Sequence, residues 1–312
     1  EQSIVSTVIE KEETQTQTRE TTAQVEEHKA SDPSISKTPI ATDSKEKLQQ
    51  NLHKIEKLEK SMSRSYLLKN FYITDSSTTI DNSIFQVRTL LTKSMVIKKE
   101  KKPQILIFHT HSQEKFADST DDDSTSILGV GDYLTELLTG KGYNVIHDRS
   151  VYDYVDGKLD RSKAYTYAEQ GIESILESNP SIEVVIDLHR DGVADTTHLV
   201  TEVDGRQMAK IMFFNGISYS NVKGNINYLY NPYRDDNLAM SLQMYLLGEA
   251  YYPGLLRNIY INAYRYCLHM KGRSMLIEAG AQTNTSTEVK NAMIPVADML
   301  DRLLRGEKAY TQ

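Results

Sequence analysis

The sequence nearly lacks cysteine and has no tryptophan. Cys267 is the only cysteine among its 312 residues. A single cysteine excludes an internal disulfide and any zinc cluster held by cysteine ligands. It does not decide the compartment, because secreted proteins without disulfides also exist.

Long hydrophobic runs and an excess of positive charge are also missing. No apolar segment approaches the roughly 18 residues of a membrane-spanning helix. No basic stretch followed by an apolar one marks a signal peptide. The formal net charge is −7 and the isoelectric point is about 5.7. Without a basic stripe to neutralise phosphates, the chain lacks the signature of a general nucleic-acid-binding protein.

The first part of the chain lacks aromatic residues and glycine. Residues 1–65 contain no Phe, Tyr or Trp, and the first glycine is Gly129. Residues 1–47 are rich in Thr, Gln, Glu, Ser and Lys, which bury too little apolar surface to offset the entropy of folding. We therefore predict a disordered tether at 1–47, a connector that packs on the body at 48–100, a main domain at 101–306 and a tail at 307–312.

Helical and extended patterns alternate after the tether. Hydrophobic residues spaced by four and three from Leu48 to Met62 predict a helix in the connector. In the main domain, apolar runs typical of strands buried on both faces alternate with helical patterns. Strands are predicted at 71–74, 105–108, 144–147, 184–189 and 274–278, helices at 127–138, 162–176, 238–251 and 287–304, and a hairpin at Asp204-Gly205. This order predicts a three-layer α/β sandwich, with a mainly parallel central sheet flanked by helices.

Metal-binding residue types follow three of these strands. The strand at 105–108 runs directly into the segment HTHSQE at 109–114. The strand at 184–189 ends in a histidine that is followed by Arg-Asp, and the last strand ends in Glu278. In a parallel sheet, ligands bind outside the carboxyl ends of the strands. We therefore expect the three clusters to meet at one edge of the sheet.

A zinc site matches these residue types. His111 and Glu114 stand three apart, and His189 from a separate strand completes a set of two histidines and one glutamate. Three protein ligands leave a fourth position open, as in hydrolytic rather than structural zinc sites. Zinc in such a site activates water and polarises a carbonyl. A carboxylate that is not a ligand must then move the proton, and we expect Glu278 to be this general acid/base.

Other residues nearby have open roles. His109 and His111 point the same way in an extended segment, so His109 is an alternative ligand, a support behind the ligands or a substrate contact. Asp191 could hold a ligand imidazole through its N–H, and Arg190 could bind a substrate carboxylate. A plain salt bridge is the alternative for both. The tyrosines of the Asn-rich stretch 228–233 could stack on a sugar or a peptide.

Six stretches of the sequence match one known family. They are Ile107-Phe-His-Thr-His-Ser-Gln-Glu114, Gly131-Asp132, Val145-Ile-His-Asp148, Val185-Ile-Asp-Leu-His-Arg-Asp-Gly192, Tyr252-Pro-Gly-Leu255, and Leu276-Ile-Glu-Ala-Gly280 with Thr283-Asn-Thr285. With these stretches, about residues 100–305 resemble the stage II sporulation protein P family, cell-wall hydrolases of endospore-forming bacteria.

The resemblance implies a function and a setting. It implies a fold like that of zinc amidases and carboxypeptidases, with Zn²⁺ as cofactor and peptidoglycan as substrate. The bond cut would be the amide between N-acetylmuramic acid and L-Ala, with endopeptidase activity on cross-links. The protein would act in forespore engulfment, with stage II sporulation proteins D and M as partners. It would be extracytoplasmic at the septum between mother cell and forespore, held by a membrane anchor that we expect before Glu1.

Two other functions fit the same residues. One is a metallopeptidase or carboxypeptidase acting on stem peptides, which would use the same ligands and the same mechanism. The other is a non-catalytic wall-binding module with a structural metal. That module would have a closed site of four ligands, in which His109 joins His111, Glu114 and His189.

Overall fold

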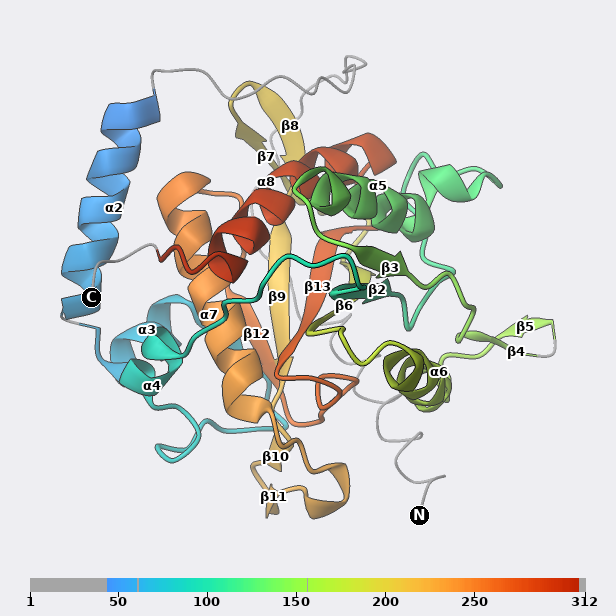
Figure 1. Cartoon of the computed structure of the whole chain (residues 1–312), viewed down its shortest axis with the longest axis horizontal. Helices are drawn as coiled ribbons and strands as arrows, with labels where there is room; N and C mark the ends of the chain where they lie inside the picture. The colour runs from blue at the N-terminus through green and yellow to red at the C-terminus, as the bar shows by residue number, and fades with distance from the viewer. Residues whose placement is uncertain (1–43, 61, 156, 309–312) are drawn as a thin grey trace.

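A seven-stranded sheet forms the centre of the protein (Figure 1). The computed structural model describes residues 44–60, 62–155 and 157–308. In the described sheet, every pair of neighbouring strands is parallel except the pair of β9 and β13, so the predicted mainly parallel sheet is confirmed. The strand order is β1 (Tyr72–Thr74), β12 (Ile259–Asn262), β9 (Ile211–Gly216), β13 (Arg273–Ala281), β6 (Val184–Asp191), β2 (Ile105–Phe108) and β3 (Val145–His147).

The antiparallel pair divides the sheet into two halves. β13, β6, β2 and β3 point in one direction, and β9, β12 and β1 point in the other. The sequence does not predict β12, because its apolar run of three residues is short and lies between two asparagines. The carboxyl ends of the two groups of strands therefore lie at opposite edges of the sheet.

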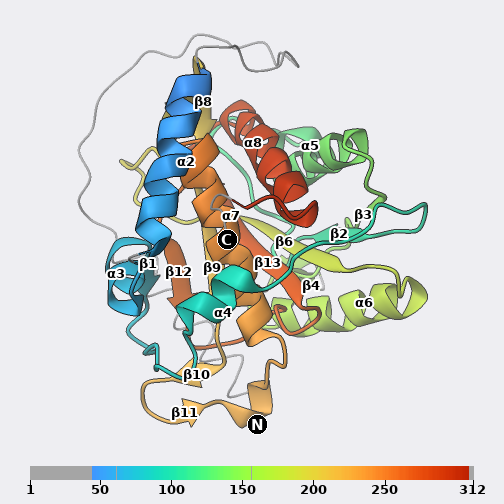
Figure 2. The same cartoon turned by 60° about the vertical axis from the view of Figure 1, so that its left-hand side comes forward.

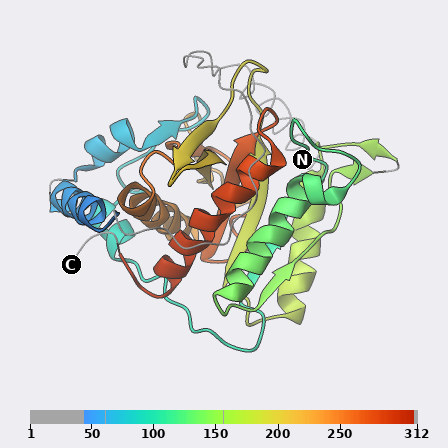
Figure 3. The same cartoon turned by 90° about the horizontal axis from the view of Figure 1, so that it is seen from above.

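Helices cover both faces of the sheet, as a three-layer arrangement requires. α5 (Ile127–Gly140), α7 (Arg234–Tyr251) and α8 (Ser286–Leu304) cover one face, and α8 lies between α5 and α7 (Figure 3). α6 (Ala164–Ser178) packs on the other face. Along β2 the side chains alternate between the two cores: Ile105 and Ile107 face α5, and Leu106 and Phe108 face α6.

The segment before the main domain is built into the body (Figure 2). α2 (Ser44–Lys60) packs on α7 and buries Ile55, which confirms the predicted helix. α3 (Arg64–Asn70) leads into β1, the outermost strand of the sheet, which pairs with β12. α4 (Val87–Thr92) packs on α7. The predicted tether up to residue 43, and residues 309–312 of the predicted tail, lie outside the described residues. Across the described ranges, no helix is both long and apolar enough to cross a membrane.

Short hairpins project from the ends of the sheet. β7 (Val200–Val203) and β8 (Arg206–Ala209) join through Asp204 and Gly205, with φ angles of 51° and 74°, which confirms the predicted turn. β10 (Tyr219–Ser220) and β11 (Gly224–Asn225) form a second hairpin at the other end of the molecule in Figure 1. The remaining short elements are β4 (Tyr154–Val155), β5 (Lys158–Leu159) and the 3-10 turns at Asp123–Thr125 and Asn227–Leu229.

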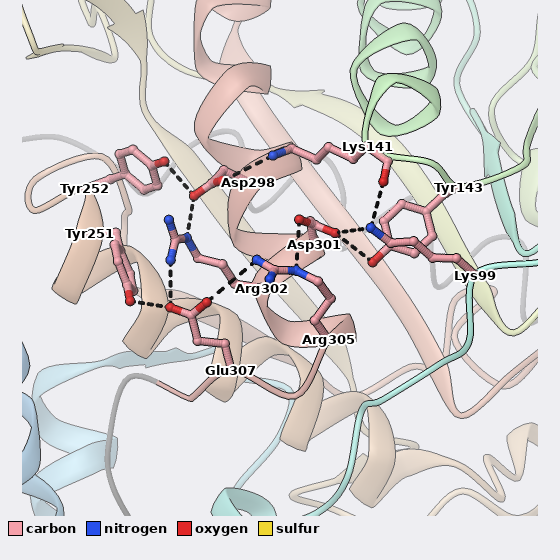
Figure 4. Close-up of polar contacts among 10 residues, drawn as sticks. All are labelled: Lys99, Lys141, Tyr143, Tyr251, Tyr252, Asp298, Asp301, Arg302, Arg305 and Glu307. Atoms are coloured by element: carbon pink, nitrogen blue, oxygen red, sulfur yellow. Dashed lines mark hydrogen bonds and ion pairs between the residues drawn. The ribbon is translucent and has the colours of Figure 1, made fainter. Parts of the chain in front are cut away.

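An ion network ties the end of α8 to its neighbours (Figure 4). Asp301 accepts hydrogen bonds from Lys99 at 2.8 Å, from the Tyr143 hydroxyl at 3.0 Å and from Arg305 at 3.1 Å. Asp298 and Glu307 both pair with Arg302 in the same network. Because Lys99 and Tyr143 precede β2 and β3, the network fixes α8 over the amino-terminal ends of these strands.

Candidate active site

Three strand ends meet at one edge of the sheet. β2, β6 and β13 are parallel neighbours, so their carboxyl ends lie side by side. Glu278 of β13 stands in register with His189 of β6, and Phe108, the last residue of β2, stands in register with Asp187. The structure thus brings together the clusters at 109–114, 189–191 and 278.

His111, Glu114 and His189 are all buried and lie next to one another. The imidazole rings of His111 and His189 meet edge to face, with centroids 5.2 Å apart. Nδ1 of His189 lies 3.8 Å from Glu114 Oε2. The same carboxylate oxygen accepts the backbone N–H of Arg190 at 2.8 Å. The turn after β2 therefore carries Glu114 back to the end of β6.

Two buried aspartates support this group, and the sequence-based prediction assigns neither a role. Asp187 Oδ1 lies 2.7 Å from His189 Nε2, and its carboxylate also accepts the N–H and hydroxyl of Thr110 at 2.9 and 2.7 Å. Asp153 Oδ2 lies 4.0 Å from His111 Nδ1. For Asp187 a signal exists, because residues two apart on a strand share a face and the sequence reads Asp-Leu-His. Asp153 carries no such signal, since it comes from a loop after β3.

The charges in this group depend on one another. Burial disfavours the imidazolium of His189, but the carboxylates of Asp187 and Glu114 outweigh it and hold the pKa of His189 well above its usual value. Burial would raise the pKa of Glu114, yet the hydrogen bond and charge of His189 lower it to about 2. The carboxylates thus make this point in the protein strongly attractive for a positive charge.

Glu278 differs from the other carboxylates of the site. The residue is half-buried, but Oε2 is closed off from solvent and has no hydrogen-bond partner within the described part of the chain. Burial of its carboxylate, and then the negative charge of Asp191, raise the pKa of Glu278 to about 8. A carboxyl group with a pKa near neutrality can both take up and release a proton.

His109 lies apart from His111 and pairs with a histidine of β3. Its Nδ1 lies 2.7 Å from the Leu188 carbonyl oxygen, and its Nε2 lies 2.8 Å from Nε2 of His147. Nδ1 of His147 contacts Asp132 at 2.9 Å. The pair sits against Gly131 of α5, where a Cβ atom would approach the two Nε2 atoms to 2.6 and 2.5 Å. The Gly131-Asp132 motif therefore makes room for both imidazoles and then anchors one of them.

In this structure Asp191 forms a salt bridge, whereas Arg190 donates to backbone carbonyl oxygens, and the substrate contact of Arg190 stays a prediction. The guanidinium of Arg190 donates to the carbonyl oxygens of Lys115 and Asp191 at 3.0 and 3.1 Å. The carboxylate of Asp191 pairs with Arg257 at 2.6 Å, and it is Asp187 that lies beside His189. The guanidinium of Arg161 lies 4.0 Å from Glu114. The sequence pattern does not reveal that Arg161 and Arg257 are cations near the site.

The residues at this edge fit zinc in donor type and charge. Two imidazoles and a carboxylate form a common zinc ligand set. His189 has a carboxylate on its Nε2, as ligand histidines usually do, and its Nδ1 faces Glu114. Among the described residues, no group of three or more His, Cys, Asp or Glu side chains is arranged to hold a metal ion as it stands. The fit therefore lies in the chemistry of the donors and in the positive charge that the carboxylates attract.

Comparison with known proteins identifies the family. A model of the stage II sporulation protein P family matches residues 2–301. The chain belongs to the stage II sporulation protein P family. The family assignment that the motifs predict is thereby confirmed.

Two individual proteins are similar to this member of the family. Stage II sporulation protein P of Bacillus subtilis (strain 168) is 23% identical over 220 residues, which cover 65% of this chain and 51% of that protein. The chain thus spans about half the length of that relative. The solved structure of the CwlD amidase from Clostridioides difficile in complex with the GerS lipoprotein covers 65% of this chain and 96% of its own, with 16% identity and a TM-score of 0.39.

Proposed function

We propose that this member of the stage II sporulation protein P family is a zinc-dependent peptidoglycan hydrolase. Its substrate bond is the amide between N-acetylmuramic acid and the L-Ala of the stem peptide, and it acts in forespore engulfment. One observation carries the proposal: Glu278, whose Oε2 makes no hydrogen bond among the described residues, stands in register with His189 at the edge that holds His111 and Glu114.

His111, Glu114 and His189 are the residues that would hold zinc. Zinc bound by such a set supplies Lewis acidity toward an amide carbonyl and toward water. The carboxylate of Asp187 holds the His189 imidazole from behind, and Asp153 adds negative charge 4.0 Å from Nδ1 of His111. The backbone N–H of Arg190 fixes one oxygen of Glu114 and so limits its rotation.

Glu278 moves the proton in the proposed reaction. Its Oε2 accepts a proton from the attacking water and then delivers it to the nitrogen of the leaving amine. The pKa of about 8 suits both steps, because the group can exist in either state near neutral pH. The carboxylate of Asp191 favours the protonated state of Glu278, and its pairing with Arg257 limits this effect.

The placement of His109 favours a catalytic over a structural metal. A structural site needs a fourth ligand, and His109 was the candidate for it in a closed site. Both of its ring nitrogens have partners, the Leu188 carbonyl oxygen of β6 and Nε2 of His147 of β3. With His109 engaged in these contacts, a metal held by His111, Glu114 and His189 would have three protein ligands, as catalytic zinc sites do.

Cleavage of peptide cross-links, association with stage II sporulation proteins D and M, and extracytoplasmic action at the septum belong to the same proposal. They follow from family membership, and a metallopeptidase acting on stem peptides would use the same residues. The bond that is cut therefore has to be read from the products.

Digestion of purified peptidoglycan with mass analysis of the products tests the proposal. Wild-type protein loaded with zinc should release stem peptides that begin with a free N-terminal L-Ala. Glu278→Gln keeps the size of the side chain and should release none while it retains its zinc. Products opened only within the peptides would favour the peptidase, and intact peptidoglycan with full zinc loading would refute the proposed hydrolysis.

A further inference from the structure

A polar cavity with exposed tyrosines lies at the sheet edge opposite the candidate active site. The loop between β11 and α7, residues 226–233, carries Tyr228, Tyr230 and Tyr233 with exposed fractions of 61%, 68% and 37%. A cavity of about 310 Å³ opens at this loop, and Tyr230 forms part of its lining. Its lining also includes Ser218, Asn225, Asn227, Asn231, Arg234 and Asp235.

The position of the cavity separates it from the proposed chemistry. Glu278 stands in register with Met212, and the cavity begins at Ser218, just beyond the end of β9. The stretch of β9 from Met212 to Gly216 alone corresponds to roughly 13 Å. Figure 1 shows the β10–β11 hairpin at the end of the molecule away from the β7–β8 hairpin, which lies at the edge of the candidate active site. A ligand that contacts both places must be long, as a polymer is.

The loop that carries the tyrosines is firmly built. The hydroxyl of Ser218 donates to the Leu229 carbonyl oxygen at 2.6 Å. The side chain of Asn231 donates to Asn237 of α7 at 3.0 Å and accepts the N–H of Tyr233 at 2.8 Å. The tyrosines are therefore presented on a fixed backbone, and a ligand would not have to order the loop when it binds.

The chemistry of the lining favours a neutral ligand that is rich in hydroxyl and amide groups. Asparagine side chains both donate and accept hydrogen bonds, as sugar hydroxyls do. The two charged lining residues, Arg234 and Asp235, lie 3.9 Å apart and offset each other. Exposed aromatic rings offer an apolar face with a polar tip, on which the flat face of a sugar ring can pack. Large exposed aromatic groups that gather at one place on a surface often mark a binding site.

We propose that the cavity and the tyrosines at 228 and 230 bind the glycan strand of peptidoglycan. This site holds the polymer, and the distant edge with Glu278 cuts it. The inference rests on the proposed function for the nature of the polymer. It does not rest on the metal or on the catalytic residues.

Sedimentation with purified, insoluble peptidoglycan tests the inference. All chains carry Glu278→Gln, so the polymer is not consumed. The double variant Tyr228→Ala/Tyr230→Ala should bind roughly tenfold more weakly, because two exposed aromatic contacts are lost. Tyr154→Ala, which removes an exposed tyrosine from β4, is the matched control and should bind as the parent does. Equal binding by the double variant and the control would overturn the inference.

Two further readouts identify the ligand and separate the inference from the proposed reaction. An N-acetylglucosamine oligomer should compete with the polymer for the parent chain, whereas competition by stem peptide alone would overturn the glycan assignment. In chains with Glu278 intact, cleavage of a short soluble muropeptide should be unchanged by the double tyrosine substitution. Absence of any cleavage by the wild type, together with tyrosine-dependent binding of polymer, would refute the hydrolase and leave the glycan site standing.

Discussion

Replacement of Gly131 by alanine probes the packing of the histidines beside the candidate active site. A Cβ at this position would lie 2.6 Å from Nε2 of His109 and 2.5 Å from Nε2 of His147. Neither ring can move away freely, since His109 is buried against the Leu188 carbonyl and His147 is held by Asp132. Overpacking of this kind typically costs about 1–3 kcal/mol.

The cost is partly offset by the helix. Alanine is favoured over glycine inside a helix by up to about 1 kcal/mol. Gly140 of the same helix has nothing within 4 Å of its hypothetical Cβ, so it supplies a matched control. Gly140→Ala should be neutral or stabilising, and Gly131→Ala should be less stable than Gly140→Ala by about 2 kcal/mol.

Urea unfolding followed by circular dichroism gives both free energies of unfolding. In a His147→Ala background, Gly131→Ala should cost less, because one of the two imidazoles that it meets is gone. Equal stability of Gly131→Ala and Gly140→Ala, or an unchanged cost in the His147→Ala background, would refute the packing described for the two histidines.

Three further predictions follow from other contacts. Burial, and then the neighbouring His147, lower the pKa of His109 to about 4. Its contribution to the free energy of unfolding is therefore fully present above pH 6.5, and it is lost as the pH falls toward 4, because the unfolded chain takes up the proton first. Between pH 6.5 and pH 4, the free energy of unfolding measured with urea should fall by about 3 kcal/mol less in His109→Asn than in wild type. An equal fall in both proteins would contradict the prediction. Asp301→Ala leaves the buried Tyr143 hydroxyl without its acceptor and removes the pairs with the more exposed Lys99 and Arg305, and should cost about 2 kcal/mol. Lys115→Ala removes an exposed pair and should change the unfolding free energy by less than about 0.5 kcal/mol; similar costs would refute the role of the network. Asp187→Asn should weaken zinc affinity roughly tenfold or more, measured by competition with a chelator, because it removes the negative charge beside His189; unchanged affinity would argue against this support.

The strands that carry the candidate site are the ones that the sequence predicts well. β2 is a continuous apolar run and β6 begins with one, Val184–Ile186, because both faces of each strand are covered. β2 leads directly into His109, and β6 itself carries His189. Their convergence then follows from the geometry of parallel strands. The antiparallel pairing of β9 with β13 cannot be predicted from either sequence, since a buried strand has the same apolar pattern in both directions.

The supporting residues of the site were harder to predict. Asp187 could have been recognised from its spacing to His189 on one strand. Asp153 and Arg161 come from the irregular region between β3 and α6, where no period relates sequence position to direction. The partnership of His109 with His147 depends on α5 crossing over both strands at Gly131, which is a tertiary contact and leaves no local pattern.

Zinc content per chain after dialysis is the most direct test of the proposed ligand set. Wild type, Glu278→Gln and His109→Asn should each retain about one zinc ion, because none of these changes touches a proposed ligand. His111→Ala and His189→Ala should retain almost none. Loss of zinc from His109→Asn with full retention by His111→Ala would contradict the assignment and move the metal to the side of α5.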